Sequence, residues 1–175
     1  NLGPAVIAAQ QAGLLINGGG HAMAAGFTVA ENRLGEFREF LITDIERQLA
    51  GSVLSPELGI DGALSPEAAT VDLIEALNEA GPFGSGNPRP RFVFPSVVTN
   101  NARVVGTDHV SCFLVAQGSQ RRLKAIAFRV AGTEVGDALL NARGGVLHIV
   151  GYLNIDAWQG DRKPQLIIED AARVR

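Results

Sequence analysis

The segment "GTEVGDALLNARG", residues 132–144, decides how the second half of this chain folds. It is the one helical segment in a region where apolar and polar residues otherwise alternate with the period of two that is typical of β-strands. Three strand candidates precede the helical segment and two follow it. These candidates are residues 92–106, 109–118, 122–130, 146–158 and 164–174.

Turn signals separate the strand candidates from one another. Gly106-Thr-Asp, Gly118-Ser-Gln and the stretch at 159–164 are rich in the glycine, proline and polar residues that turns require. Five short strands with a helix between the third and the fourth describe an OB-fold, a small and partly open β-barrel. Other small barrels have five strands but seldom this helix, so the sequence predicts an OB-fold over residues 92–175.

The first half of the chain has a different periodicity. Pro4 suits the first position of a helix that continues through residues 5–15, and the glycines at 18–20 end it as a turn. A short strand is expected at 25–30, followed by a helix that is capped by Asn32 and stops at Gly51. The second helix carries an apolar stripe that consists of Leu34, Phe37, Leu41, Ile45 and Leu49.

A connector joins the two halves. Residues 51–67 cluster Gly, Ser and Pro and contain Ser-Pro-Glu twice, around a segment able to form an extended strand. Ser65 and Pro66 favour the start of a helix that Gly81-Pro82 closes, and residues 81–92 are too rich in Gly and Pro for regular structure. The fold class is therefore α+β, with a partial α/β part ahead of the barrel.

Composition limits the classes of protein that fit. At 175 residues, with 46% hydrophobic and 19% charged residues, the chain suits a globular fold and not a disordered one. Its one cysteine, Cys112, excludes an internal disulfide and a cysteine-based zinc site, which fits the reducing cytoplasm. No run of about 18 apolar residues is present. Because the chain begins with Asn1 and its only methionine is Met23, we expect a piece of a longer protein.

Charge is distributed unevenly along the chain. Residues 1–84 carry three basic against eleven acidic side chains, whereas residues 85–175 carry twelve basic against seven acidic ones. A basic half beside an acidic half is typical of a polyanion-binding module. Two solvated domains that attract each other would give the same distribution, and charge alone does not decide between them.

The stretch "NGGGHAMAAGF", residues 17–27, is the strongest candidate for a site in the first half. Consecutive glycines allow backbone N–H groups to converge on an anion, and His21 could donate to a phosphate oxygen. The spacing fits neither a P-loop, since no lysine follows Gly26, nor a dinucleotide fingerprint, since position 23 is methionine. A tight helix-to-strand turn with His21 packed beside it explains the same pattern without any ligand.

A family resemblance adds to these patterns. The stretch "GGGHAMAAGF" resembles the signature of the domain that accompanies DHH-type phosphoesterases, which are named for an Asp-His-His motif in their catalytic domain. The second half is similar to the OB domain of the RecJ family of bacterial single-stranded-DNA-specific exonucleases. The segments that carry this similarity are "PFGSGNPRPRF" (82–92), "VVGTDHVSCFL" (104–114), "AIAFR" (125–129), "LNIDAW" (153–158) and "PQLIIEDA" (164–171).

The resemblance implies a domain organisation and a site. Residues 1–51 correspond to the C-terminal part of the DHH-associated domain, 52–91 to a strand-helix connector, and 92–175 to an OB domain that binds nucleic acid. It further implies that Gly18, Gly19, Gly20 and His21 bind the scissile or adjacent phosphate, with His21 in an electrostatic role. The metal ions of the family, Mn²⁺ or Mg²⁺, belong to the catalytic domain, which this chain lacks. We therefore expect no metal site and no nuclease activity in this chain alone.

Single-stranded DNA is the expected ligand of the barrel, because OB-folds bind strands through a basic track and aromatic faces. Trp158 lies at the start of a usual ligand-contact loop, although a plug at the end of the barrel would also explain it. His109 and Tyr152 are expected to pack or to line an edge. Arg129 is a further basic residue of this half. The candidate DNA-binding residues are Arg89, Arg91, Arg103, Arg121, Arg122, Lys124, Trp158, Arg162 and Lys163.

Charged residues of the second helix of the first half are expected to form a solvated outer face that DNA avoids. They are Glu36, Arg38, Glu39, Asp44, Glu46 and Arg47.

Three functions remain open on the sequence. The leading hypothesis is the substrate-binding C-terminal region of a 5′-to-3′ single-stranded-DNA exonuclease, whose partners are single-stranded DNA and the missing catalytic domain. A fragment of a DHH-type oligoribonuclease or phosphodiesterase is the first alternative, which the barrel disfavours. The second is a non-catalytic OB module that docks a repair protein, since an OB-fold by itself does not fix the ligand.

Overall fold

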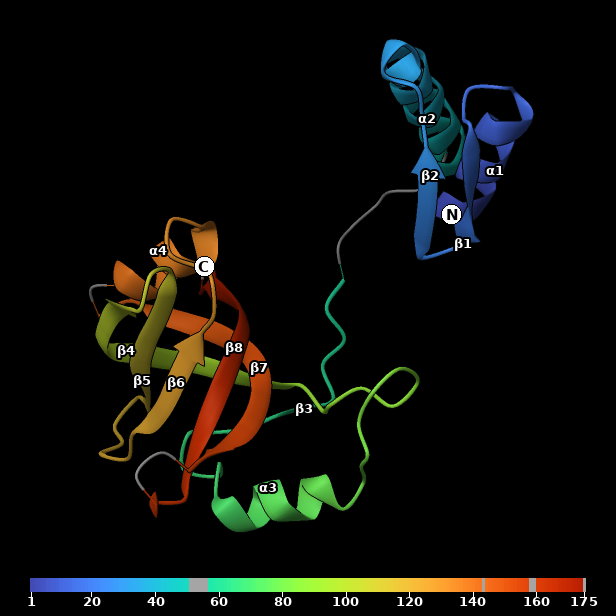
Figure 1. Ribbon diagram of the computed structural model, residues 1–175. Helices are drawn as coiled ribbons and strands as arrows, with labels where there is room; N and C mark the ends of the chain where they lie inside the picture. The colour runs from blue at the N-terminus through green and yellow to red at the C-terminus, as the bar shows by residue number, and fades with distance from the viewer. Residues whose placement is uncertain (51–56, 143, 158–159, 175) are drawn as a thin grey trace. The chain divides into compact units, whose positions relative to one another are not determined.

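Five strands of the second half of the chain pair into a closed barrel in the computed structural model of this protein (Figure 1). The structure describes residues 1–50, 57–142, 144–157 and 160–174. It divides into two units, Asn1–Glu57 and Leu58–Arg175. The domain boundaries predicted at 51/52 and 91/92 stay predictions.

The barrel confirms the OB-fold prediction. Its strands are β4 (Phe92–Val105), β5 (His109–Ala116), β6 (Leu123–Ala127), β7 (Val146–Asp156) and β8 (Lys163–Arg173). They follow one another in the order β4-β5-β6-β8-β7, and β7 pairs back with β4 to close the barrel. Strands β6 and β8 run parallel, and the other barrel pairs are antiparallel. Helix α4 (Glu134–Leu140) lies between β6 and β7 in the chain, where the sequence predicted it.

The connector belongs to the same unit as the barrel. Strand β3 (Gly62–Ala63) adds two residues in parallel beside β4. Helix α3 (Val71–Asn78) starts later than predicted, because Thr70 and not Ser65 caps it. The hydroxyl of Thr70 accepts a hydrogen bond from the backbone N–H of Leu73 (3.2 Å), whereas residues 66–68 form a turn.

A single apolar core fills the barrel and both of its ends. Phe94, Leu114 and Leu123 are buried inside the barrel. The two helices lie at opposite ends of the barrel (Figure 1), and α4 contributes Leu139 to the core while α3 contributes Ile74. Because side chains alternate along each strand, one face of the strand packs into this core and the other face lies on the outer surface of the barrel, where it can bind a ligand.

Cys112, buried in this core, provides a test of barrel integrity. Burial raises the pKa of its thiol to about 12. At pH 8 the reactive thiolate is then only about 10⁻⁴ of the thiol population. We expect alkylation by iodoacetamide to be negligible in the folded protein at pH 8 and rapid in urea, as measured by mass spectrometry. Rapid labelling without denaturant would contradict a closed barrel around Cys112.

The first unit is a β-hairpin flanked by two helices. Its elements are α1 (Leu2–Gln11), β1 (Asn17–His21), β2 (Ala24–Thr28), a 3₁₀ turn η1 (Glu31–Arg33) and α2 (Leu34–Leu49). The predicted glycine turn is wrong, because Gly18, Gly19 and Gly20 form strand β1 and pair antiparallel with β2. The predicted cap at Asn32 is also wrong, since η1 includes that residue and α2 follows directly after Arg33.

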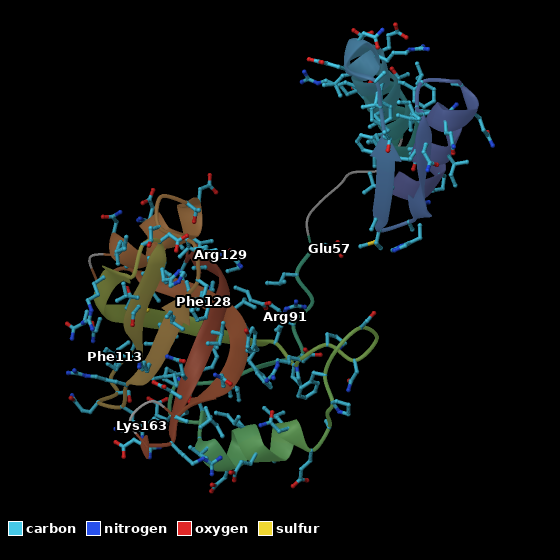
Figure 2. All side chains as sticks on the ribbon, viewed as in Figure 1. Glu57, Arg91, Phe113, Phe128, Arg129 and Lys163 are labelled. Atoms are coloured by element: carbon cyan, nitrogen blue, oxygen red, sulfur yellow. The ribbon has the colours of Figure 1, made fainter. Side chains whose placement is uncertain are left out.

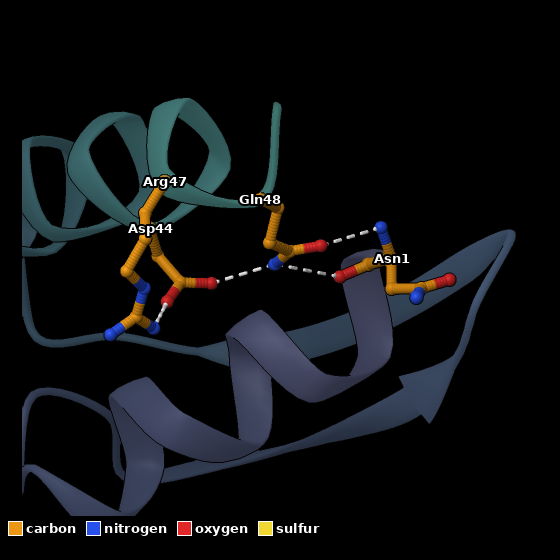
Figure 3. A network of polar contacts seen from close by, with 4 residues as sticks. All are labelled: Asn1, Asp44, Arg47 and Gln48. Carbon is orange, nitrogen blue, oxygen red and sulfur yellow. Dashed lines mark hydrogen bonds and ion pairs between the residues drawn. The ribbon is translucent and has the colours of Figure 1, made fainter. Parts of the chain in front are cut away.

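Asp44 corrects the expected outer face of α2. Its side chain is 7% exposed and lies on the inward face of the helix, with Phe37 and Phe40. Figure 3 shows why a carboxylate is tolerated there: Arg47 donates a hydrogen bond to Asp44 Oδ1 and Gln48 donates one to Oδ2 (2.7 Å). A buried charge is stable only when it is paired in this way.

Candidate nucleic-acid interface

A hollow of about 500 Å³ opens on the outer surface of the barrel. Four of the barrel strands contribute one lining residue each, β8 contributes two, and the segments that precede β6 and β8 contribute one each. Four cations line the hollow, namely Arg103, Arg122, Lys124 and Lys163. Phe113 lies among them, and so do the carboxylates of Asp156 and Asp161. The structure thus brings four of the nine candidate DNA-binding residues to one place.

Strand alternation turns Phe113 outward. Its neighbours Cys112 and Leu114 are buried in the core, so Phe113 faces the opposite side of β5. The antiparallel register places it across from Lys124 of β6. Phe113 was not among the candidate residues predicted from the sequence. The signal that could have identified it is its position in β5 between two apolar residues that face the core, Cys112 and Leu114.

Two of the four cations form ion pairs, of which the Lys124 pair is part-buried and the Lys163 pair is exposed. Lys124 Nζ lies 2.6 Å from Asp156 Oδ2, and Lys163 Nζ lies 2.7 Å from Asp161 Oδ2. The hydrogen bond and charge of Lys163 lower the pKa of the Asp161 carboxyl, and Asp161 in turn raises the pKa of Lys163. The Lys163–Asp161 pair therefore remains charged at neutral pH, and an exposed pair of this kind is weak enough for a phosphate to replace the carboxylate.

Arg103 and Arg122 are the two cations of the hollow whose guanidinium groups are free to bind an anion. Both side chains are exposed, and neither forms an ion pair with any residue that the structure describes. A guanidinium in this state offers several donors in one plane to a phosphate. These two arginines are therefore the strongest candidates for direct phosphate contacts.

Arg89 and Arg91, predicted to bind DNA, hold the connector against the barrel. The Arg89 guanidinium carbon lies 5.4 Å from the ring centre of Phe83 and 5.7 Å from that of Tyr152. Arg91 Nε donates a 2.5 Å hydrogen bond to Glu169 Oε2, and this hydrogen bond and the charge of Glu169 raise the pKa of Arg91. The structure does not bring these two arginines into the hollow.

Arg121 and Arg162, two further predicted residues, contact the acidic connector. Arg121 Nη1 donates to the backbone oxygen of Glu67 (3.3 Å), and Arg162 Nη2 lies 2.7 Å from Glu75 Oε1. The pKa of Glu67 is lowered, first by a hydrogen bond from Ser119 and least by the charge of Arg121. Trp158 lies outside the described residues.

These contacts change the meaning of the charge asymmetry. Residues 58–84 hold five acidic side chains and no basic one, and they belong to the same unit as the barrel. Counted over the whole unit, Leu58–Arg175, the sequence has twelve basic and twelve acidic residues. The basic half and part of the acidic half thus offset each other within one unit, and an excess of basic side chains is found only locally, as at the hollow.

Glu75 is expected to reduce the affinity of this unit for DNA. Changing Glu75→Gln frees Arg162 from its ion pair, so affinity for a single-stranded oligonucleotide should rise about two- to fivefold, the usual range for one exposed pair. Fluorescence anisotropy measures this affinity. Glu79→Gln is the matched control, because it removes the same charge from the same segment where no ion pair is described. An equal gain in both variants would mean that net charge alone is responsible.

Packing explains two of the three consecutive glycines of strand β1. A Cβ on Gly18 would lie 2.8 Å from Val6 Cγ1, and one on Gly20 would lie 2.4 Å from the Ala24 oxygen. Gly19 has no atom within 4 Å of the same position, and neither has its cross-strand partner Gly26. Both line a hollow of about 420 Å³ beside the hairpin. Packing within this unit therefore does not require glycine at either position.

His21 ends strand β1 and is exposed. Its Nδ1 accepts a hydrogen bond from the backbone N–H of Met23 (3.3 Å), which leaves Nε2 directed away from this contact. The predicted anion nest does not form, because the three glycines are paired in a strand and none has a positive φ. If a phosphate binds at this hairpin, it therefore binds against the exposed backbone face at Gly19 and not in a concave loop of glycines.

Over the residues that the structure covers, no three His, Cys, Asp or Glu side chains gather as a metal site. Within the same residues, no helix is both long enough and apolar enough to cross a membrane.

The fold and the hollow define an OB domain with a cationic face of the type that binds nucleic acids. Comparison with known families agrees: the family model described as "RecJ OB domain" matches residues 60–170. The chain belongs to this family.

Curated relatives support the assignment. The chain is 34% identical over 159 residues to the single-stranded-DNA-specific exonuclease RecJ of Dickeya dadantii, and 32% over 160 residues to that of Escherichia coli. Each alignment covers 90% of this chain but 26% of the relative. With RecJ of Bacillus subtilis the identity is 29%, over 88% of this chain and 19% of the relative. The chain thus spans about a fifth to a quarter of the length of the curated relatives it matches.

Solved structures confirm the fold. RecJ of Thermus thermophilus in complex with Mn²⁺ matches 97% of this chain, and 24% of its own, with a TM-score of 0.67 and 24% identity. The same protein in complex with Mg²⁺ matches 98% of this chain, and 25% of its own, with a TM-score of 0.64 and 20% identity.

Proposed function

We propose that this chain is the substrate-binding C-terminal region of a 5′-to-3′ single-stranded-DNA exonuclease of the RecJ type, acting in DNA repair and recombination in the cytoplasm. The single observation that carries the proposal is the hollow in which Arg103, Arg122, Lys124 and Lys163 surround Phe113 on an OB barrel. Cations for phosphates beside an aromatic face for a base are the combination that single strands require.

The hollow binds the strand through two kinds of contact. Arg103 and Arg122 take phosphates directly, and Lys124 and Lys163 exchange their carboxylates for phosphates. Phe113 stacks on one base. Stacking needs an unpaired base whose face is open, so the hollow selects a single strand over a duplex. Asp156 and Asp161 keep the hollow from binding polyanions too tightly for the strand to advance.

The glycine hairpin supplies a second phosphate contact in this proposal. Gly18, Gly19, Gly20 and His21 hold the phosphate close to the reacting one, where His21 offsets negative charge as water attacks. The open face at Gly19 supports this assignment. Mn²⁺ or Mg²⁺ and the residues that bind it belong to a DHH catalytic domain outside this chain, so this chain alone has no nuclease activity. The partners of the chain are single-stranded DNA, that catalytic domain and repair proteins.

Fluorescence anisotropy with a labelled oligothymidine, and with a duplex of the same length, tests the proposal at two salt concentrations. We expect tighter binding to the single strand, weakening steeply as salt rises because phosphate contacts release counterions. Binding that ignores salt would favour an apolar docking surface for a protein. Equal affinity for the duplex would contradict the proposed stacking of an unpaired base on Phe113.

A further inference from the structure

The segment "AIAFR", residues 125–129, contains an exposed aromatic residue that does not line the hollow. Phe128 is 49% exposed, although phenylalanine is usually buried. Its ring contacts His109 edge-on, with ring centres 5.1 Å apart. This contact fixes the ring of Phe128 while one face stays in solvent.

Phe128 and Phe113 lie on the same side of the barrel wall. Val110 pairs with Ala127 and both face the core, so one further step in the register places Phe128 across from His109, facing outward. Ser111 and Ile126 form the outward pair in between, and Phe113 with Lys124 form the next one. In Figure 2, Phe113 and Lys163 lie toward one end of the barrel, and Phe128 and Arg129 toward the other.

Arg129 brings a cation to Phe128 through a strained backbone. Its φ is 56°, in the left-handed region that residues other than glycine seldom adopt. The N–H of Arg129 donates to His109 Nδ1 (3.0 Å), and Asp108 Oδ1 lies 2.9 Å from the same nitrogen. Such strain is typical of functional positions. The Arg129 side chain is exposed and forms no ion pair within the described part of the chain.

We propose that Phe128 is a second base-stacking position for the single strand, with Arg129 as its phosphate contact and His109 as the residue that positions both. This inference rests on the proposed function of the hollow. Four residues of extended strand separate His109 from Phe113, a distance of about 13 Å. That is about four times the 3.4 Å rise of stacked neighbours, so bases on the two rings are not consecutive in one stack. The strand is held extended between them.

The surface favours a nucleic acid over a protein as its occupant. The outward face of β5 and β6 is continuous from the hollow to Phe128, and the arginines beside it, Arg103, Arg122 and Arg129, form no ion pair with any described residue. Isolated aromatic rings in a cationic strip match a strand of alternating bases and phosphates. A protein-docking patch would instead need a contiguous apolar area.

Tryptophan fluorescence tests this inference on the 175-residue chain. Phe128→Trp in a Trp158→Phe background places the only tryptophan at this position. We expect an oligothymidine of about 15 nucleotides, close to the longest site of one OB fold, to quench the tryptophan as a base stacks on it. Quenching should saturate in parallel with anisotropy.

Affinity measurements complete the test. We expect Phe128→Leu to weaken oligothymidine binding about tenfold without changing its salt dependence, and Phe128→Tyr to bind like the parent. Arg129→Ala should lower the salt slope by about 0.7. Leu58→Ala, at another exposed apolar residue of the same unit, is the control. If Arg122→Ala weakens binding while Phe128→Trp is not quenched and Phe128→Leu binds normally, the second position is wrong and the hollow stands. If the parent chain binds no single strand, both proposals fail.

Discussion

Replacing Gly151 by alanine is expected to unfold the barrel at much lower urea concentrations than the parent protein requires. A Cβ at Gly151 would lie 2.0 Å from the backbone oxygen of Ile167, far inside van der Waals contact. This close approach occurs where the register between β7 and β8 shifts, between Val150 and Gly151. Neither backbone can move without opening the pairing that closes the barrel. We expect a loss of about 3 kcal/mol or more in the free energy of unfolding.

Alkylation of Cys112 as a function of urea measures this effect on the barrel unit alone. A reporter inside one unit is needed because a protein of two units need not unfold in one step. Gly84→Ala is the control, since a Cβ there meets no atom within 4 Å. If the midpoints of the two variants coincide, the close contact at Gly151 does not limit stability.

Removing both unpaired arginines of the hollow is expected to have the largest effect on DNA binding. Each hydrogen bond to a charged group contributes about 1.5–3 kcal/mol, so Arg103→Ala with Arg122→Ala should weaken single-strand binding at least roughly 100-fold at low salt. The slope of log affinity against log salt should fall by about 1.4, since each phosphate contact on a single strand contributes about 0.7. The barrel should remain folded, because both side chains are exposed.

Anisotropy titrations over a series of salt concentrations give both quantities. Arg173→Ala provides the control, because Arg173 is also exposed on a barrel strand but does not line the hollow. A slope that stays constant in the double variant would place the phosphate contacts elsewhere on the protein.

The barrel could be predicted from sequence because period-two alternation and turn residues are local signals. Four of the five strands and α4 lie within the predicted ranges, and β8 starts one residue earlier than predicted, at Lys163. The start of α3 could not be located in the same way. Ser65 and Thr70 are both acceptable caps, and only the packing of Ile74 against the barrel selects Thr70.

The candidate site could be predicted less well than the fold, because sequence gives charges but not their partners. Arg103 and Arg122 were predicted and are available, whereas Arg89 and Arg91 are held by Tyr152 and Glu169. These contacts join residues more than sixty positions apart. The turn predicted at Gly18–Gly20 was wrong for a different reason. Glycine is compatible with both a turn and a strand, and packing of this segment against α1 decides between the two.

If the hollow binds DNA as proposed, its ion pairs make binding partly an exchange reaction. When a phosphate displaces Asp161 from Lys163, or Asp156 from Lys124, one anion replaces another on the same cation and few small ions are released. These two lysines then add affinity that barely depends on salt. The salt slope of the parent protein therefore counts the cations that were unpaired before binding, and it underestimates the number of phosphates held.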